Sequence, residues 1–374
     1  MRENDRLKVT ALADIINMKV YGRTTECRSP LTLFWTGSAV EFNAKGSELW
    51  LEVEVDYDAY EPWVSILIND VPVSRQMLTA GRYWVCLFRG MKENVIKNVR
   101  MIKDVQAMSG DTNCSLQLHA VKFDGEFLPV GEKPLKLEFI GDSITSGEGA
   151  MGSKEEDDWI PMWFSAVDNY CAMTAQALNA DMRIISQSGW GVLTGWDNNP
   201  HCNIPEYYEK VCGILNGEKN RALGAFEDYD FASWQPDAIV VNLGTNDTGA
   251  FYSPEWKDEV TGEVHKQRLN EDGSFHADDL KAFELAVTNF LIKLRKYNRK
   301  AHIVWAYGML GIPMMPSIYR AVDHYVNKTG DRNVSVFQLP NTTEEALGAR
   351  KHPGLRAHEK AAEELVEHLK GFIN

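Results

Sequence analysis

Four short apolar runs in the last two-thirds of the chain most constrain its fold. Each ends in a glycine, and longer segments separate one run from the next. Continuous apolar runs are typical of strands buried on both faces of a sheet. Strands that alternate with helices form a mostly parallel sheet covered on both sides, and such sheets bind ligands beyond the carboxyl ends of their strands. The runs are LKLEFIG (135–141), MRIISQSG (182–189), DAIVVNLG (237–244) and AHIVWAYG (301–308).

Three of the intervening or following segments have helical character: residues 168–180, 279–297 and 358–372. In the second, apolar residues recur at steps of three and four, which places them on one helical face. The sequence therefore predicts an α/β fold of three layers, with a mostly parallel sheet, for this part of the chain. The apolar residues of the second segment are Leu280, Phe283, Ala286, Val287, Phe290, Leu291 and Leu294.

The first 130 residues or so have a different pattern, in which apolar and polar residues alternate and turn residues separate the runs. Alternation with period two is the pattern of half-buried strands, and several such strands without a long helix indicate a β-sandwich. We expect a domain at 1–130 and a second one at 135–374, joined by the polar connector VGEKPLK. The expected strands are ELWLEVEVDY (48–57), PWVSILIND (62–70), VPVSR (71–75), GRYWVCLF (81–88) and SLQLHAVKF (115–123).

Composition narrows the classes of partner. The chain has 39 Lys and Arg against 53 Asp and Glu, a formal charge of −14, so we expect no nucleic-acid partner. The N-terminal residues lack the apolar core of a signal peptide, and no stretch is apolar enough to cross a membrane. The six scattered cysteines indicate reduced thiols. Together these features predict a cytoplasmic protein without a membrane partner, and they make no prediction of its oligomeric state.

The first apolar run continues as GDSITSG, which puts the hydroxyl of Ser143 at the carboxyl end of a strand. A serine hydroxyl is a weak nucleophile until a base takes its proton, and the oxyanion formed on attack needs hydrogen-bond donors. A turn from strand to helix exposes the hydroxyl and directs free backbone N–H groups towards that charge. The same Asp-Ser pair is also common helix-capping chemistry, so by itself it decides nothing.

Three more residues stand in comparable places. Gly189 can present its backbone N–H to a substrate oxygen, and Asn246, in GTND, can donate its side-chain amide. His352 precedes a proline, which favours an extended residue just outside the last helix. Each residue alone also has a purely structural interpretation. It is a glycine turn for Gly189, a helix cap or Asx turn for Asn246, and a structural histidine for His352. We expect Asp247 to hold its loop and His358 to lie on the surface.

The segments that contain Ser143, Gly189, Asn246 and His352 form four sequence blocks. In this order along the chain, they resemble the blocks of the SGNH (GDSL-like) hydrolases over roughly residues 135–374. The resemblance implies Ser143 as the nucleophile and His352 as the general base. It also implies an oxyanion hole from the N–H groups of Ser143 and Gly189 and the side chain of Asn246. Acyl transfer to the serine would be followed by attack of water on the acyl-enzyme. The resemblance implies no metal and no cofactor.

The first part of the chain makes the resemblance more specific. GRT (22–24) and LTLFWTGSAVEFNAKGS (31–47), ahead of KLEFIGDSITSGEG and SGWGV, are similar to carbohydrate esterase family 2. Members of that family carry an N-terminal jelly-roll domain and remove acetyl groups from plant polysaccharides such as xylan and glucomannan. The implied function is therefore a carbohydrate O-acetylesterase with an acetylated oligosaccharide as its substrate.

The sequence departs from the family pattern at one place. The usual aspartate three residues before the histidine is Ala349 here, and Arg350 follows it. The chain resembles members that work with a Ser–His dyad, in which a backbone carbonyl orients the histidine. An acid from elsewhere, such as Glu344 or Glu345, is the alternative, and a silent protein retained for carbohydrate binding is another.

Sugar rings stack on aromatic side chains, so aromatic residues near the strand ends are candidate substrate contacts. Trp190 follows the oxyanion glycine, Trp159 and Trp163 lie in the segment after the nucleophile turn, and Tyr307 ends a later run. Packing in the core is the alternative for each, and it is the one we favour for Trp305. A lipase or thioesterase for longer acyl chains remains the alternative enzyme, while the lack of a His/Asp cluster at ligand spacing speaks against metal-dependent deacetylation.

Overall fold

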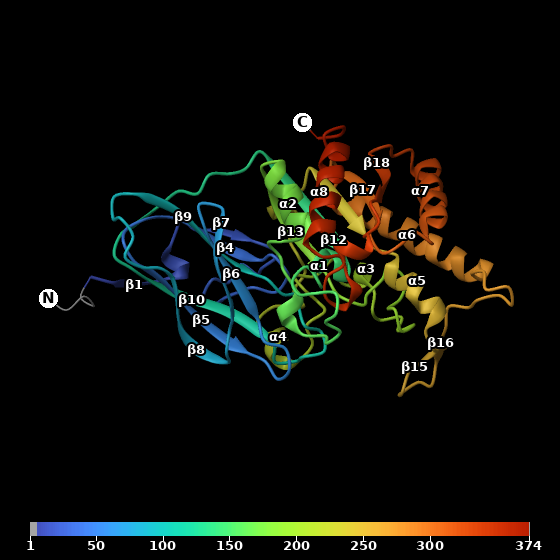
Figure 1. The fold of residues 1–374 in the computed structure, drawn as a ribbon, viewed down its shortest axis with the longest axis horizontal. Coiled ribbons are helices and arrows are strands. Elements are labelled where there is room, and N and C mark those ends of the chain that lie inside the picture. The colour runs from blue at the N-terminus through green and yellow to red at the C-terminus, as the bar shows by residue number, and fades with distance from the viewer. Residues whose placement is uncertain (1–5, 374) are drawn as a thin grey trace. The chain divides into compact units, whose positions relative to one another are not determined.

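A computed structural model describes residues 6–373, which form two compact units (Figure 1). Neither unit is continuous in sequence. The first comprises the N-terminal residues to Glu132 together with 160–167 and 209–229, and the second comprises the remainder of the chain. Two short segments that the sequence assigns to the region after residue 135 thus belong to the first unit. The expected domain boundaries, 1–130 and 135–374, stay a prediction.

The first unit is built from two antiparallel sheets. One has the strand order β1-β10-β5-β8, with β3 beside β10, and the other has the order β11-β4-β9-β6-β7, with β2 beside β4. Its elements are β1 (Lys8–Ala11), η2 (Leu12–Asp14), β2 (Lys19–Tyr21), β3 (Leu31–Thr32), β4 (Ala39–Lys45), β5 (Leu49–Asp56), β6 (Trp63–Ile68), β7 (Val71–Met77), β8 (Gly81–Phe88), β9 (Ile96–Lys103), β10 (Ser115–Phe123), β11 (Glu126–Leu128), η3 (Pro161–Trp163) and α4 (Glu218–Ala222).

Alternation along the strands explains how the two sheets share one core. In β5 the residues at every second position, from Leu49 to Val55, are buried, and those between them are half-buried. They join one hydrophobic cluster with residues of both sheets, such as Val40 and Val64. Strands β6 and β7 form a hairpin that turns at Asn69 and Asp70, whose φ angles of 52° and 63° suit a type I′ turn.

Hydrogen bonds from side chains of the β strands and loops hold the two added segments in the first unit. Arg75 donates to the carbonyls of Met162 and Phe164, at 2.9 and 2.7 Å, and Asp104 accepts from the N–H of Ala166 at 3.1 Å. The indole of Trp35 likewise donates to a carbonyl in 209–229. These contacts explain why the segments belong to the β unit, although the sequence places them among the later strands and helices.

The second unit contains a five-stranded parallel sheet in the order β13-β12-β14-β17-β18. Its elements are β12 (Leu135–Gly141), α1 (Ser143–Ser146), α2 (Tyr170–Ala177), β13 (Ala180–Ser186), α3 (Ile204–Tyr207), η4 (Phe231–Ser233), β14 (Ala238–Asn242), α5 (Thr245–Tyr252), β15 (Trp256–Lys257), β16 (Val264–His265), α6 (Ala277–Tyr297), β17 (His302–Gly308), α7 (Met315–Thr329), β18 (Val334–Leu339), η5 (Glu344–Ala346), η6 (Ala349–Lys351) and α8 (Leu355–Leu369).

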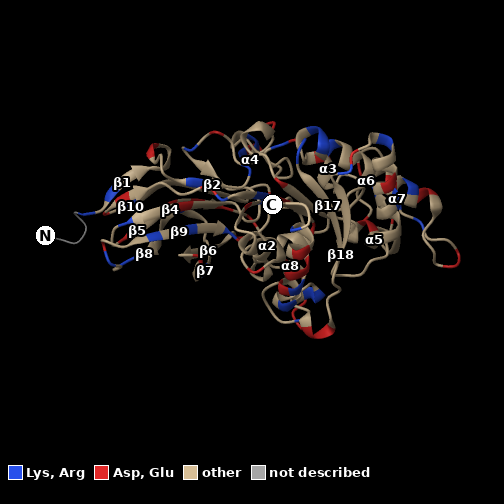
Figure 2. Cartoon of the chain, turned by 90° about the horizontal axis from the view of Figure 1, so that it is seen from above, with Lys and Arg blue, Asp and Glu red and all other residues tan. Residues whose placement is uncertain are grey.

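Helices cover both faces of this sheet (Figure 1). Helices α2 and α8 share one core with strand residues such as Phe139 and Val240, and α6 packs Phe290 edge-on against Trp305 of β17 on the other side. Charged residues line the outward side of α8 (Figure 2). The predicted fold class is confirmed: a β-sandwich of jelly-roll type and a three-layer α/β unit with a mostly parallel sheet. Within residues 6–373, no helix is both long and apolar enough to span a membrane.

The strand register brings three chain segments to one edge of the sheet. Gly141, the last residue of β12, is level with Ser186 of β13 on one side and with Asn242 of β14 on the other. The residues that follow these three positions therefore leave the sheet side by side. This edge carries Ser143, Gly189 and Asn246.

Candidate active site

Ser143 is the first residue of α1, directly after β12. The carboxylate of Asp142 caps this short helix by accepting the N–H of Ile144 at 3.0 Å, and Gly147 ends it with a φ of 75°. The Ser146 hydroxyl donates to that of Ser186 at 2.8 Å, which joins the turn to the end of β13. The local sequence thus fixes the turn on both sides and leaves Ser143, 6 % exposed, at its beginning.

His352 meets Ser143 although 209 positions separate them. Its Nε2 lies 2.9 Å from Ser143 Oγ, and its Nδ1 lies 3.1 Å from the backbone carbonyl of Arg350. The carbonyl can only accept, so Nδ1 carries the proton and Nε2 is free to accept the serine proton. This is the geometry that a serine nucleophile and its general base require.

The structure also tests two further expectations: that a glutamate could orient His352, and that His358 lies on the surface. Glu344 pairs at the surface with Lys154, at 3.1 Å, and the exposed Glu345 carboxylate is hydrogen-bonded to Thr343, so neither of the two alternative acids has the histidine as its partner in these contacts. His358 was expected at the surface, and that prediction is wrong. It is fully buried, its Nδ1 accepts the N–H of Tyr170 at 3.2 Å, and burial lowers its pKa to about 3. It is therefore a neutral core histidine that links α8 to α2.

The two other expected donors lie at the same edge. Gly189 has a φ of 81°, a conformation that side-chain-bearing residues rarely adopt, and a Cβ there would lie 3.0 Å from the Trp196 ring. The amide nitrogen of Asn246 lies 3.2 Å from Asp142 Oδ2 and 2.9 Å from the carbonyl of Trp190. Both amide hydrogens of Asn246 thus have an acceptor in this arrangement.

Two buried aspartates support the edge. Asp247 accepts the backbone N–H groups of 192–194 at 2.8 to 3.2 Å, so it holds the loop after β13, as expected. Burial raises its pKa to about 6 against the effect of these hydrogen bonds. Burial also raises the pKa of Asp142 to about 7, and the carboxylates of Asp247 and Glu148 add to that rise. Such shifted carboxyl groups are typical of functional sites.

The aromatic residues expected to contact substrate differ in their surroundings. Trp190 and Tyr307 are only 8 % and 1 % exposed, and the Tyr307 hydroxyl lies 3.2 Å from that of Thr248, so neither offers an open ring face. Trp159 is half-buried in the second unit, and Trp163 belongs to the first unit; for both, a substrate role stays a prediction. Trp305 is buried in the core, as expected.

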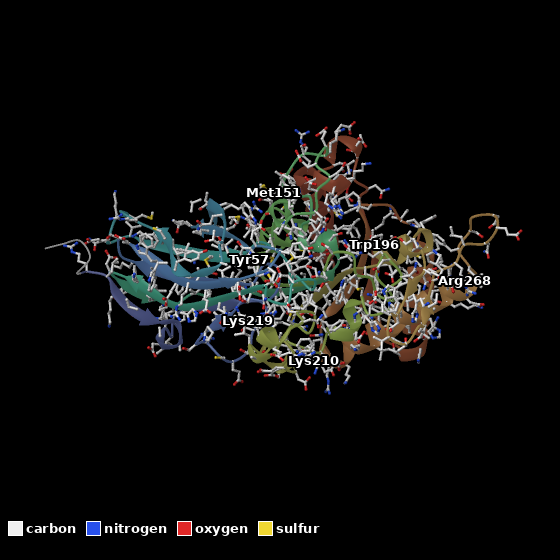
Figure 3. All side chains as sticks on the ribbon, turned by 90° about the horizontal axis from the view of Figure 1, so that it is seen from below. Tyr57, Met151, Trp196, Lys210, Lys219 and Arg268 are labelled. Carbon is white, nitrogen blue, oxygen red and sulfur yellow. The ribbon has the colours of Figure 1, made fainter. Side chains whose placement is uncertain are left out.

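Sequence reasoning missed two features of this edge. Trp196, labelled in Figure 3, is 56 % exposed, and its backbone N–H donates to the carbonyl of Gly189 at 3.0 Å. Its signal in the sequence is the turn GWDNN that follows the glycine block. The other feature is an ion pair between Glu148 and Arg350, with 2.9 Å between Oε1 and Nε. No local sequence pattern indicates this pair, because 202 positions separate the two residues.

The described part of the chain contains no group of three or more His, Cys, Asp or Glu side chains placed to hold a metal ion. The groups that are brought together are a hydroxyl, an imidazole held in one tautomer, and amide donors at the same strand edge. This set is suited to acyl transfer, in which a hydroxyl attacks a carbonyl and N–H groups stabilise the resulting oxyanion.

Comparisons with known proteins agree with this geometry. The family model for GDSL-like Lipase/Acylhydrolase matches residues 137–365, which include all four predicted blocks. An acetyl xylan esterase (Est2A) from the rumen bacterium Butyrivibrio proteoclasticus has a similar solved structure. Its TM-score is 0.95 and its sequence is 47 % identical, with 98 % of each chain covered.

Two curated proteins are more distant relatives. The cellulase/esterase CelE of Acetivibrio thermocellus is 26 % identical over 346 residues, which are 91 % of this chain and 37 % of the relative. An acetylxylan esterase / glucomannan deacetylase of Cellvibrio japonicus is 27 % identical over 256 residues, which are 67 % of this chain and 66 % of the relative. The matched region thus spans between about a third and two-thirds of these curated relatives.

Proposed function

Because the chain belongs to the GDSL-like lipase/acylhydrolase family, we propose that it is a carbohydrate O-acetylesterase that acts on acetylated xylan- or mannan-type oligosaccharides. The observation that carries the chemistry is the 2.9 Å contact between His352 Nε2 and Ser143 Oγ. The sugar substrate is supported by the similarity to an acetyl xylan esterase and to a protein named acetylxylan esterase / glucomannan deacetylase.

In the proposed first half-reaction, Ser143 Oγ attacks the acetyl carbonyl carbon and its proton passes to His352 Nε2. The carbonyl oxygen becomes an oxyanion, which the N–H groups of Ser143 and Gly189 and the amide of Asn246 stabilise. When this intermediate collapses, the bond between the acyl carbon and the sugar oxygen breaks. The sugar leaves with the proton from the imidazolium, and the acetyl group stays on the serine.

The second half-reaction repeats these roles with water. His352 takes a proton from water as its oxygen attacks the acetyl-enzyme, and the proton then returns to Ser143 Oγ as acetate leaves. Asn246 has both amide hydrogens near acceptors, so one of them has to turn from the Trp190 carbonyl towards the oxyanion. The Asp142 contact can persist and keep the amide close to the nucleophile.

Trp196 is the aromatic residue best suited to a sugar ring. It is exposed, and its backbone is hydrogen-bonded to Gly189, the proposed oxyanion donor. Stacking between two aromatic rings contributes about 0.5–1.5 kcal/mol, and a contribution of the same size to a sugar contact corresponds to an affinity change of roughly 2- to 12-fold. Trp196→Ala should therefore raise the KM for an acetylated oligosaccharide within that range and leave 4-nitrophenyl acetate hydrolysis unchanged.

The test is acetate release from acetylated xylo- and manno-oligosaccharides by the wild type and by Ser143→Ala, with 4-nitrophenyl acetate and octanoate beside them. We expect release by the wild type, a loss of at least about a thousandfold in the variant, and a preference for acetate over octanoate. A preference for octanoate would favour a lipase or thioesterase instead. Binding of the oligosaccharides without turnover of any ester would make the protein a carbohydrate-binding protein and refute the proposal.

A further inference from the structure

The backbone next to His352 has an uncommon conformation. Arg350 and Lys351 have φ angles of 56° and 55°, in the left-handed region that residues with side chains rarely adopt. This conformation is sterically costly for a residue with a Cβ and persists only where the surroundings enforce it. It is also the conformation in which the Arg350 carbonyl lies 3.1 Å from His352 Nδ1. The groups that enforce it therefore determine how the histidine is oriented.

Three contacts fix Arg350. Its backbone N–H donates to the carbonyl of Glu156 at 2.6 Å, its Nη1 donates to that of Asp157 at 3.1 Å, and its Nε donates to Glu148 Oε1 at 2.9 Å. Glu148 is the charged one of these acceptors. Its side chain is 2 % exposed, and an ionised carboxylate at such burial is stable only with a charged or hydrogen-bonding partner.

Glu148 also belongs to the turn that carries the nucleophile. Its backbone N–H donates to the carbonyl of Ser143 at 3.0 Å. The next residue, Gly149, passes so close to the histidine that a Cβ there would lie 2.5 Å from His352 Cβ. One carboxylate thus joins the serine turn to the segment that carries the base, two parts of the chain separated by 202 positions.

We propose that Glu148 and Arg350 are positioning residues: their ion pair holds the Arg350 carbonyl against His352 Nδ1, where a triad acid would otherwise stand. The proposal rests on the proposed function, since it concerns how the base of that reaction is oriented. The pair has a second effect. Glu148 Oε1 lies 3.8 Å from His352 Nε2, and its bond to Arg350 keeps it from displacing Ser143 as the partner of that nitrogen.

Two other roles for the pair make different predictions. If Glu148 acted directly through its charge on the imidazolium, removal of the neutralising Arg350 would leave kcat unchanged or raise it. If the pair only stabilised the fold, its loss would lower the urea midpoint while kcat per folded molecule stayed at the wild-type value. Positioning predicts instead that either substitution lowers kcat, with little change in KM.

The kinetic experiment compares Glu148→Gln, Arg350→Met and the double variant with 4-nitrophenyl acetate as substrate. We expect each single variant to lose about 10- to 100-fold in kcat with KM changed less than threefold, and the double variant to be no worse than the worse single one. Arg350→Lys, which keeps the charge, should retain more activity than Arg350→Met. The matched control is the exposed Lys154–Glu344 pair, whose Lys154→Met and Glu344→Gln variants should keep kcat within twofold.

A spectroscopic readout separates this proposal from the proposed function, because it needs no turnover. Protein labelled with ¹⁵N-histidine, with His352→Gln to assign the signal, reports which ring nitrogen of His352 carries the proton. We expect one Nδ1–H tautomer in the wild type and a mixture in Glu148→Gln and Arg350→Met. Unchanged tautomers together with kcat within twofold of wild type would overturn the positioning role, whereas a wild type without esterase activity would overturn only the proposed function.

Discussion

In the first unit Asp104 is buried among the strands of a sandwich, and in the second Asp142 is buried at the end of a parallel strand. Asp104 has a cation beside it, since Arg75 Nε lies 3.2 Å from its carboxylate, and it also accepts from Ser65 and Ala166. Asp142 accepts only neutral N–H groups, from Ile144 and Asn246, among the contacts of the described residues.

The lack of a cation bears on the pKa of Asp142. Burial without a cation raises the pKa of Asp142 to about 7, next to the nucleophile. Burial of an acid is therefore not by itself a sign of function. A buried acid with a cationic partner and a full set of donors holds segments together, while a buried acid without a cation at a strand end is part of the reacting edge.

The largest effect should come from replacing Asp104, the buried acid with a structural role. Asp104→Ala leaves Arg75 without its counter-charge and two buried donors without an acceptor, which should lower the free energy of unfolding by about 3–5 kcal/mol. Activity per folded molecule should not change, because the proposed catalytic groups all belong to the second unit. Urea unfolding and kcat at saturating substrate measure the two effects.

The control for Asp104 is Asp70, which is 63 % exposed and pairs with Arg100 at 2.6 Å in the same unit. Asp70→Asn, which removes the charge but suits the positive φ angle of this turn position, should cost less than about 1 kcal/mol, as loss of an exposed ion pair usually does. A loss of kcat in Asp104→Ala that exceeds its loss of folded protein would contradict the division between the two acids.

The second effect is a loss of kcat on replacing Asn246, whose side-chain amide contacts Asp142. Asn246→Ala removes one proposed oxyanion donor, so kcat should fall about 100-fold or more while KM for 4-nitrophenyl acetate stays within a few-fold. Thermal unfolding should change little, since the side chain lies at the edge of the sheet and not in its core. If the variant lost stability but kept kcat, Asn246 would be a structural residue like Asp104.

The smallest effect is on the pH dependence of stability. The folded state binds the Asp142 proton up to about pH 7, while the ordinary value is 3.8, so this group makes the protein less stable as pH rises between these values. Asp142→Asn removes that contribution. Between pH 4.5 and 7.5, the Tm of the wild type should therefore fall by a few degrees more than the Tm of Asp142→Asn does. This difference does not depend on the Tm of the variant at pH 4.5. Parallel Tm curves for the two proteins would contradict the raised pKa.

Much of the fold could be predicted because its strands have simple patterns. The continuous apolar runs of β12, β13, β14 and β17 and the alternation in β5 each follow from how a strand is buried. The edge strand β18 was not predicted, since most of its residues are half-exposed and it lacks a continuous apolar run. Segments 160–167 and 209–229 could not be placed, because contacts from distant residues such as Arg75 decide where they pack.

Prediction of the site was limited in the same way, by contacts between residues far apart in the sequence. Ser143, Gly189 and Asn246 were predictable, since residues that follow parallel strands meet at one edge. The partnership of Glu148 with Arg350 joins positions 202 residues apart, and no local pattern indicates it. The error at His358 was avoidable, because on a helix it shares a face with buried residues three, four and seven positions later.

The central claim is that Ser143 is activated by His352, and covalent labelling tests it most directly. An alkyl fluorophosphonate reacts with an activated serine, and peptide mass spectrometry locates the adduct. We predict one adduct, on Ser143, formed at least about a hundredfold more slowly in His352→Gln. An adduct on another residue, or labelling of Ser143 at an equal rate in both proteins, would contradict the account.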